Sequence, residues 1–248
     1  ELEGATFGIK GEVTLAGGGL STATFSRVQL NRGDDVSVNI RRSGKGFAVR
    51  VKGDTLDARS LIKQFMADTD TATKSAGSNS VSVSANVAKM VGFGGEALQN
   101  VSIDYSGSGN RINGLTVAAT AASGGLITVS NAPKGDGRRM DVRSADAGAV
   151  LRFLDVYGRM QGGSLALALE SAGDGPLRGQ VDVREFWVVD EPRLASIVSS
   201  KPAGDTRSLN QAVRKDIDVS RVKFERGFAQ IDKREKYLAL ADGVLRGP

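Results

Sequence analysis

The sequence predicts a mainly β protein with a few short α-helices, and three observations lead to that class. Short segments in which apolar and polar residues alternate recur along the chain, as expected for strands with one apolar face. Glycine-rich turns of a few residues separate these segments, and such short connections favour antiparallel hairpins over parallel β-α-β units. Glycine accounts for 32 of the 248 residues and proline for only five, which fits an ordered chain with many tight turns.

Eight segments carry the alternation most clearly. They are Val36–Ile40, Phe47–Val51, Val81–Ala85, Val101–Tyr105, Leu115–Val117, Ile127–Val129, Leu165–Leu169 and Val181–Val183. Each predicts a strand with one apolar face, and the turns between them predict an antiparallel sheet. A lone sheet must cover such a face with another layer, close on itself, or offer the face to an apolar ligand.

Three short helical patterns interrupt the strands, and each begins at an aspartate that predicts an N-cap. Apolar residues follow each aspartate at helical spacing and form one stripe, which we expect to pack on the sheet. The three groups are Asp57 with Leu61, Ile62 and Phe65, Asp146 with Val150, Leu151 and Leu154, and Asp190 with Leu194, Ile197 and Val198.

The same order of features recurs along the chain, which predicts an irregular internal repeat. A glycine pair comes first, at Gly18–Gly19, Gly94–Gly95 and Gly162–Gly163, and a run of strands and a short helix follow. Repetition of this kind is typical of architectures built by adding units in one dimension. We expect residues 1–248 to form one elongated segment of a larger protein, with units at approximately 1–67, 68–156, 157–200 and 201–248, the last truncated. A single β-sandwich covered by a few helices is the alternative.

The residue inventory excludes most catalytic chemistry. The sequence has no cysteine and no histidine, so it holds no disulfide, thiol nucleophile, Cys/His zinc site or Ser-His-Asp triad. The string Gly92–Ala97 has the spacing of a dinucleotide fingerprint, but no helix of several turns follows it, so it predicts a turn. We therefore expect no enzyme activity, no catalytic residue, no cofactor and no metal.

Three further features have structural interpretations. The carboxylate pairs Asp34–Asp35 and Asp216/Asp218 have the residue type for calcium or acid–base chemistry, but we interpret both pairs as solvated. Trp187, the only tryptophan, precedes the third helical pattern and is interpreted as an anchor between sheet and helix.

The charge distribution argues against nucleic acid as a partner. The net charge is +5 and the sequence pI is about 9.6, but the basic residues fall into small groups with acidic residues among them. No aromatic stacking motif accompanies these groups, so we expect no nucleic-acid binding. Contact with an anionic lipid or a polyanionic surface stays open, because each cation near such a surface contributes about 1 kcal/mol. No apolar stretch approaches the roughly 18 residues of a membrane-spanning helix.

The C-terminal hundred residues resemble a known family. The stretch Asp146–Ser200 contains Met-Gln-Gly-Gly-Ser-Leu-Ala-Leu and Phe-Trp-Val-Val-Asp-Glu-Pro-Arg-Leu-Ala, and Asp218–Pro248 ends in Tyr-Leu-Ala-Leu-Ala-Asp-Gly-Val-Leu-Arg-Gly-Pro. These stretches are similar to the AsmA-like C-terminal region of YhdP-type envelope proteins, in the AsmA/TamB superfamily of Gram-negative bacteria. The composition is similar to that of alphaproteobacterial members.

The resemblance implies an elongated, twisted antiparallel sheet that curves into an open groove, with helices packed at its edges. It implies a periplasmic segment of an inner-membrane-anchored envelope protein, with the anchor and further groove segments as partners. The implied function is non-catalytic: an apolar β-groove holds phospholipid acyl chains during transport between the inner and outer membranes and so supports outer-membrane lipid homeostasis.

Apolar positions of the predicted strands are the candidates for the lining of this groove. They are Val36, Val38, Ile40, Phe47, Val49, Val51, Ile103, Leu115, Val117, Leu165, Leu167, Leu169, Val181 and Val183. Ordinary core packing is the alternative role of each residue. For the whole chain, the alternative is a non-catalytic structural or interaction β-sandwich module of an envelope protein that binds a protein or polymer partner.

Overall fold

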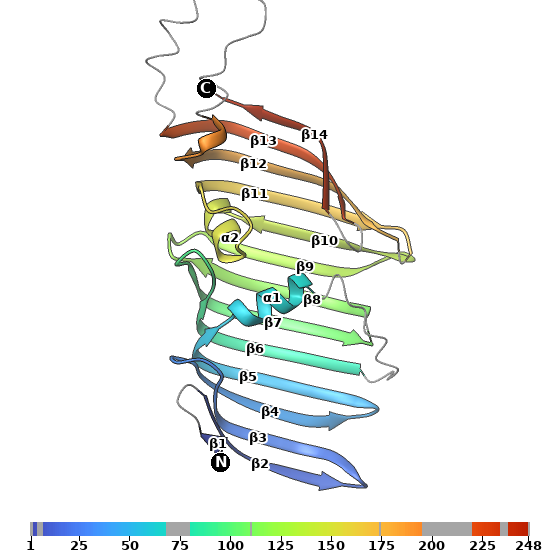
Figure 1. Ribbon diagram of the computed structural model, residues 1–248. Coiled ribbons are helices and arrows are strands. Elements are labelled where there is room, and N and C mark those ends of the chain that lie inside the picture. The colour runs from blue at the N-terminus through green and yellow to red at the C-terminus, as the bar shows by residue number, and fades with distance from the viewer. Residues whose placement is uncertain are drawn as a thin grey trace, which may run out of the picture.

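The computed structural model describes residues 2–3, 7–67, 80–109, 111–173, 175–194, 220–233 and 238–247, and it contains one open β-sheet (Figure 1). The sheet has 14 strands, of which the first has only two residues. The strands are β1 (Leu2–Glu3), β2 (Gly8–Ala16), β3 (Gly19–Gln29), β4 (Asp35–Ser43), β5 (Gly46–Asp57), β6 (Ser80–Val91), β7 (Ala97–Ser108), β8 (Arg111–Ala121), β9 (Leu126–Lys134), β10 (Gly137–Ser144), β11 (Met160–Ser171), β12 (Leu177–Val189), β13 (Arg221–Lys233) and β14 (Leu238–Arg246).

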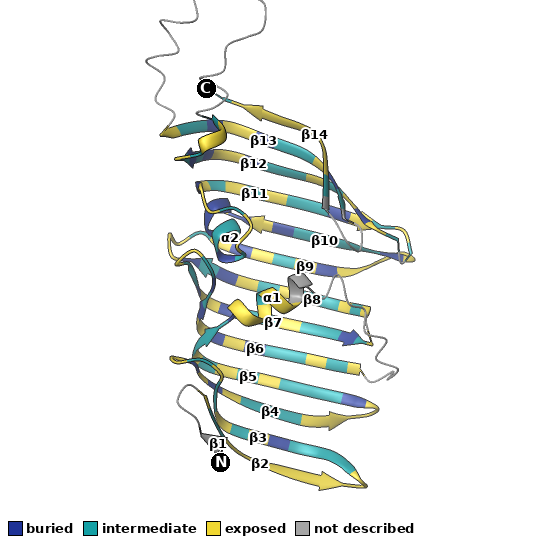
Figure 2. Cartoon of the chain, viewed as in Figure 1, coloured by how far each residue is buried: buried dark blue, intermediate teal, exposed yellow. Residues whose placement is uncertain are grey.

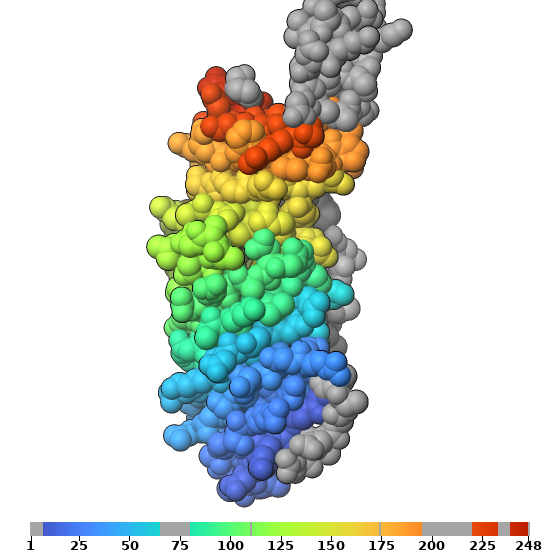
Figure 3. All heavy atoms as spheres, turned by 90° about the vertical axis from the view of Figure 1, so that its left-hand side faces the viewer, coloured from blue at the N-terminus to red at the C-terminus, as the bar shows by residue number. Residues whose placement is uncertain are grey.

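The strands follow one another across the sheet in the order of the sequence. β1 lies at one edge and β14 at the other, so the sheet is not closed. Figure 3 shows the same order as successive bands from the N-terminal to the C-terminal end of the molecule. The predicted class, a mainly β and largely antiparallel open sheet with short helices, is confirmed. The single β-sandwich is wrong, because all described strands belong to this one sheet.

One strand pair departs from the predicted antiparallel order. β5 and β6 are parallel, with Val49 opposite Val83 and Val51 opposite Ala85. Helix α1 (Arg59–Ala67) follows β5 directly. β6 then begins beside the start of β5, at the opposite end of the strands from α1's N-terminus. Parallel neighbours need such a crossover because the chain must return to the end at which the previous strand began.

The helices lie over one face of the sheet. Figure 1 shows α1 and α2 (Ala147–Phe153) in front of the central strands. Asp146 is the N-cap of α2 as predicted, and its carboxylate accepts a hydrogen bond of 2.9 Å from the Ala149 amide. Asp57 lies two residues before α1, where its carboxylate accepts a 3.0 Å bond from the Arg59 amide.

The third helical pattern begins differently from the prediction. Residues 192–194 are helical, and Glu191, not Asp190, accepts the hydrogen bond from the Arg193 amide, at 3.2 Å. The backbone of Asp190 has a left-handed φ of 51°, and its amide donates to the Ser220 carbonyl. Ile197 and Val198 lie outside the described residues, as do Asp216, Asp218 and the side chain of Phe65.

The main core cluster lies where the helices meet the sheet. Ala149, Val150 and Phe153 of α2 pack against buried apolar residues from β6 to β9. The turn at Gly92 approaches this helix so closely that a Cβ at that position would overlap the Phe153 ring. This contact explains the glycine, and the string Gly92–Ala97 forms the predicted turn between β6 and β7.

Candidate functional site

An apolar row crosses the sheet without interruption from β4 to β13. Residues directly opposite one another on paired strands share a face of the sheet, so the register identifies the row. Its members are Val38, Val51, Ala85, Ile103, Val117, Val129, Val142, Leu167, Val181 and Ala229. We call this the middle row and the face that carries it the apolar face. The row crosses nine strand spacings of about 4.8 Å, or about 43 Å.

A second row runs parallel to the middle row, two residues along each strand. It contains Ile40, Val49, Val83, Tyr105, Leu115, Asn131, Met140, Leu169, Gly179 and Ile231. We call this the hairpin-side row, because it lies toward the hairpins at residues 44–45 and 135–136. The row is apolar except at Tyr105 and Asn131.

A third row lies on the other side of the middle row, toward α2, and we call it the helix-side row. It includes Val36, Val87, Val101, Ala119, Ile127, Leu165 and Val183. Val101, Ala119 and Ile127 are buried in the same cluster as the helix residues Val150 and Phe153. The helices therefore cover the apolar face mainly along this row.

All fourteen predicted groove residues lie on the apolar face. Three of them are buried, namely Val36, Leu169 and Val183, and the other eleven are half-buried. Figure 2 shows this pattern, with half-buried segments along the strands and the buried residues concentrated near α2. Phe47 extends the face by one further row, because it pairs with Arg42 and Val81 beyond the hairpin-side row.

Several members of the apolar face were not predicted. Val142 and Met140 lie on β10, whose charged sequence Gly-Arg-Arg-Met-Asp-Val-Arg-Ser obscures the alternation. Ala85 and Val129 occupy the middle row between predicted members. The alternation of apolar and polar residues along each strand could have identified all of these residues. The pairing register of the strands then aligns them into rows.

The opposite, polar face carries a ladder of ion pairs across β10–β13. Arg139 lies 3.0 Å from Glu170, and on the next two strands Arg178 lies 3.3 Å from Asp232. The four residues oppose one another in register, so their charges alternate in sign from strand to strand. Exposed ion pairs of this kind contribute little stability. The alternation does, however, keep like charges from lying opposite each other on neighbouring strands.

Hydrogen bonds from arginine lower the pKa of carboxylates on this face. A bond from Arg184 is the main cause for Asp182, and Arg226 adds a second at 2.5 Å. Arg139 likewise lowers the pKa of Asp141 through a 2.5 Å hydrogen bond. These carboxylates have structural partners, which argues against an acid–base role for them.

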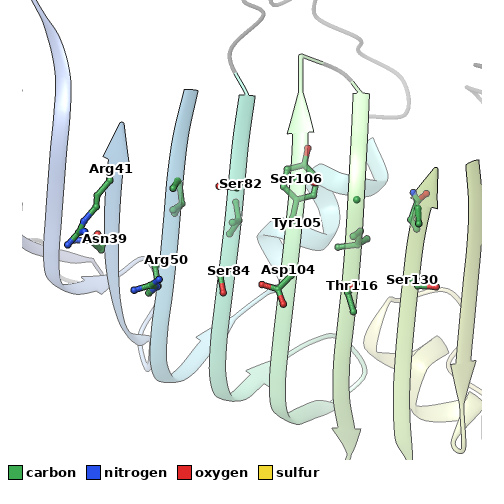
Figure 4. A pocket seen from close by; sticks show the side chains of 17 residues that line it. Asn39, Arg41, Arg50, Ser82, Ser84, Asp104, Tyr105, Ser106, Thr116 and Ser130 are labelled. Carbon is green, nitrogen blue, oxygen red and sulfur yellow. The ribbon is translucent and has the colours of Figure 1, made fainter. Parts of the chain in front are cut away.

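The polar face has a hollow of about 490 Å³ between β4 and β9. Asn39, Arg41 and Arg50 line one side of it, and Asp104 with the hydroxyl side chains Ser82, Ser84, Ser106, Thr116 and Ser130 lies on the other strands (Figure 4). Five lining residues belong to the hairpin-side row, so their side chains alternate to the apolar face; they are Val49, Val83, Tyr105, Leu115 and Asn131. This hollow is therefore distinct from the predicted groove.

Two sequence interpretations are wrong in the structure. Asp34 is not solvated but 4% exposed, and its carboxylate accepts hydrogen bonds from the amides of Leu30, Asn31 and Asp57 at 2.7–3.1 Å. Trp187 does not anchor a helix, because it lies on the polar face with the Arg221 guanidinium 4.4 Å from its ring centre.

The anchor that Trp187 was expected to provide comes from its neighbour. Phe186 stacks on Phe224 at a centroid distance of 5.3 Å. Glu185, with a left-handed φ of 52°, interrupts the alternation just before Phe186, so that Phe186 and Val188 reach the buried side. A pattern of strict alternation does not reveal such an irregularity.

The described residues contain few groups suited to catalysis or metal binding. Within these ranges, no three acidic side chains gather in a way that could hold a metal ion. Among the same residues, no helix has the length and apolar character needed to cross a bilayer. No family model, curated protein or solved structure matches this chain.

Proposed function

We propose that the chain is a segment of a periplasmic lipid conduit that holds phospholipid acyl chains on its apolar face. The observation that carries the proposal is the middle row, an uninterrupted line of aliphatic side chains about 43 Å long. Eight of its ten members are half-buried, so an apolar ligand can bury further surface there. The resemblance of residues 146–200 and 218–248 to AsmA-like proteins agrees with this function.

Energetics and geometry both favour acyl chains as the occupant. Each buried methylene contributes about 0.8 kcal/mol, so two chains of a phospholipid are held firmly without directional contacts. Neighbouring positions along the row present similar aliphatic surfaces, so a lipid moves between them with low barriers. The row crosses ten strands, so it accommodates several chains that lie along the strands side by side.

The test is the amount of phospholipid that co-purifies with the protein and with two neighbouring variants. Leu167→Asp places a carboxylate in the middle row, whereas Ala166→Asp makes the same change at an exposed position of the polar face. A carboxylate in contact with acyl chains costs several kcal/mol, so we expect more than about a tenfold loss of lipid for Leu167→Asp alone.

Native mass spectrometry and organic extraction measure the bound lipid, and far-UV circular dichroism checks folding. Val49→Asp with Ala48→Asp repeats the comparison on β5. A folded Leu167→Asp variant with undiminished phospholipid would contradict the proposal. A wild-type protein that binds no lipid would favour the alternative role, a structural or interaction module.

A further inference from the structure

Asn131 is the one amide in the hairpin-side row of the apolar face. It is 6% exposed and lies between Leu115 on β8 and Met140 on β10. Its side-chain amide makes no hydrogen bond to any residue that the structure describes, although it offers two donors and one acceptor. The Asn131 amide keeps a little contact with solvent, so its donors and acceptor are accessible to a polar group of a ligand.

A cation lies beside this amide on the same face. Arg138 pairs with Pro133, two residues from Asn131 on β9, which makes Arg138 and Asn131 diagonal neighbours about 7–8 Å apart. Arg138 is half-buried and forms no ion pair with the described residues, whereas Arg139 on the polar face pairs with Asp141 and Glu170. Among the residues that the structure describes, this one cation of the hairpin therefore has no acidic partner.

Along β9 and β10, the side chains of the apolar face change from charged to polar and then to aliphatic. Arg138 lies nearest the hairpin, Asn131 comes next, and the aliphatic Val129 and Val142 follow. Ile127 is two residues further and belongs to the buried cluster with Phe153. A phospholipid has the same order of groups: a phosphate, then acyl esters, then hydrocarbon. From Asn131 to Ile127 the strand extends about 13 Å, close to the roughly 15 Å of one hydrocarbon leaflet.

We propose that Asn131 and Arg138 bind the polar end of a phospholipid and orient it on the apolar face. The Arg138 guanidinium binds the phosphate, and the Asn131 amide donates a hydrogen bond to an acyl ester carbonyl. The acyl chains then run along β9 and β10 toward α2. Tyr105, two strands away in the same row, supplies a hydroxyl at the same level. This inference rests on the proposed function and adds a fixed orientation to it.

Photocrosslinking with two lipids tests the orientation. One phosphatidylglycerol carries a diazirine beside the glycerol, and the other carries it at the end of an acyl chain. We expect the first to label residues 131–140 and the second to label residues 126–128 and α2. The reversed distribution, or equal labelling of both regions by both lipids, overturns the orientation while the proposed function stands. Absence of labelling on the apolar face with either lipid refutes the proposed function itself.

The two side chains are tested separately with matched lipids and variants. For Asn131, we expect the wild type to prefer a diester phospholipid over its diether analogue about fivefold, the effect of one hydrogen bond. Asn131→Leu should remove this preference, while Asn86→Leu on the polar face of β6 keeps it. A preference that survives Asn131→Leu overturns the assignment.

For Arg138, the comparison is between phosphatidylglycerol and diacylglycerol with the same chains. We expect Arg138→Met to abolish the preference for the phospholipid, and Arg143→Met, on the polar face of β10, to leave it intact. Inorganic phosphate should not displace the bound lipid. Displacement at millimolar phosphate would identify a simple anion site and overturn the proposal.

Discussion

The buried carboxylate of Asp34 ties the turn at residues 30–34 to the end of β5. One oxygen accepts from the Leu30 and Asn31 amides and the other from the Asp57 amide, across 23 positions of sequence. Hydrogen bonds to a charged group contribute about 1.5–3 kcal/mol, and their loss leaves amides unpaired. We expect Asp34→Ala to lower the free energy of unfolding by about 2–3 kcal/mol in urea titrations. Asp35→Ala, at an exposed neighbouring position, should change it by less than about 0.5 kcal/mol.

The Asp182 carboxylate makes stability depend on acid pH. Its pKa in the folded protein lies below the ordinary value of 3.8, because Arg184 and then Arg226 donate hydrogen bonds to it. The resulting stabilisation is fully present above the unfolded pKa and is lost as pH falls through the folded pKa. We expect Asp182→Asn to lower unfolding free energy by less than about 1 kcal/mol at pH 7, with the difference vanishing toward pH 2. Asp136→Asn is the control, and a difference that persists at pH 2 would exclude this carboxylate as the cause.

At the scale of elements, α2 depends on close contact with the turn at Gly92. A methyl group at Gly92 would overlap the Phe153 ring, so the helix must move or the ring must rotate. Overpacking of this kind costs about 1–3 kcal/mol. We expect Gly92→Ala to lower the midpoint of thermal unfolding, whereas Gly158→Ala, where a Cβ meets open space, should be tolerated. Equal effects of the two substitutions would show that the contact with Phe153 is unimportant.

Elements were predictable where alternation was uninterrupted. All eight segments predicted as strands lie within strands, and Asp146 caps α2 as expected. Five longer strands contain none of these segments, namely β2, β3, β10, β13 and β14. Charged residues obscure the alternation in β10, and register shifts interrupt it in the other four. The parallel pairing of β5 with β6 was also missed, because a short helix does not indicate at which end of the sheet the next strand begins.

At the scale of the whole molecule, pairing in sequence order makes the protein elongated. Thirteen spacings of about 4.8 Å give a sheet about 62 Å across its strands. A compact sphere of the same length of chain has a radius of gyration of about 18 Å and a diameter of roughly 46 Å. We expect small-angle X-ray scattering to give a maximum dimension above about 60 Å and an asymmetric distance distribution. A symmetric distribution that ends near 46 Å would rule out the extended sheet.

The rows of the apolar face belong to this largest scale, and the sequence alone does not reveal them. Alternation placed Val38, Ile103 and Leu167 on apolar faces of their own strands. Only the pairing register aligns them in one row, and a slip of one residue on any strand would interrupt it. Asn131 was overlooked for a related reason, since it follows the segment Ile127–Val129 and its burial depends on neighbouring strands.

Each strand pairs only with its two neighbours in the chain, so strands can be added to the sheet without changing how the existing strands pair. Duplication of one hairpin would add two strands, about 9.6 Å of sheet, without disturbing the cross-section anywhere else. Duplication of the gene segment that encodes a hairpin would lengthen each row by two residues, and the added side chains would have the same apolar character. The length of such a sheet can therefore change with the number of its hairpins, while each existing strand keeps its neighbours.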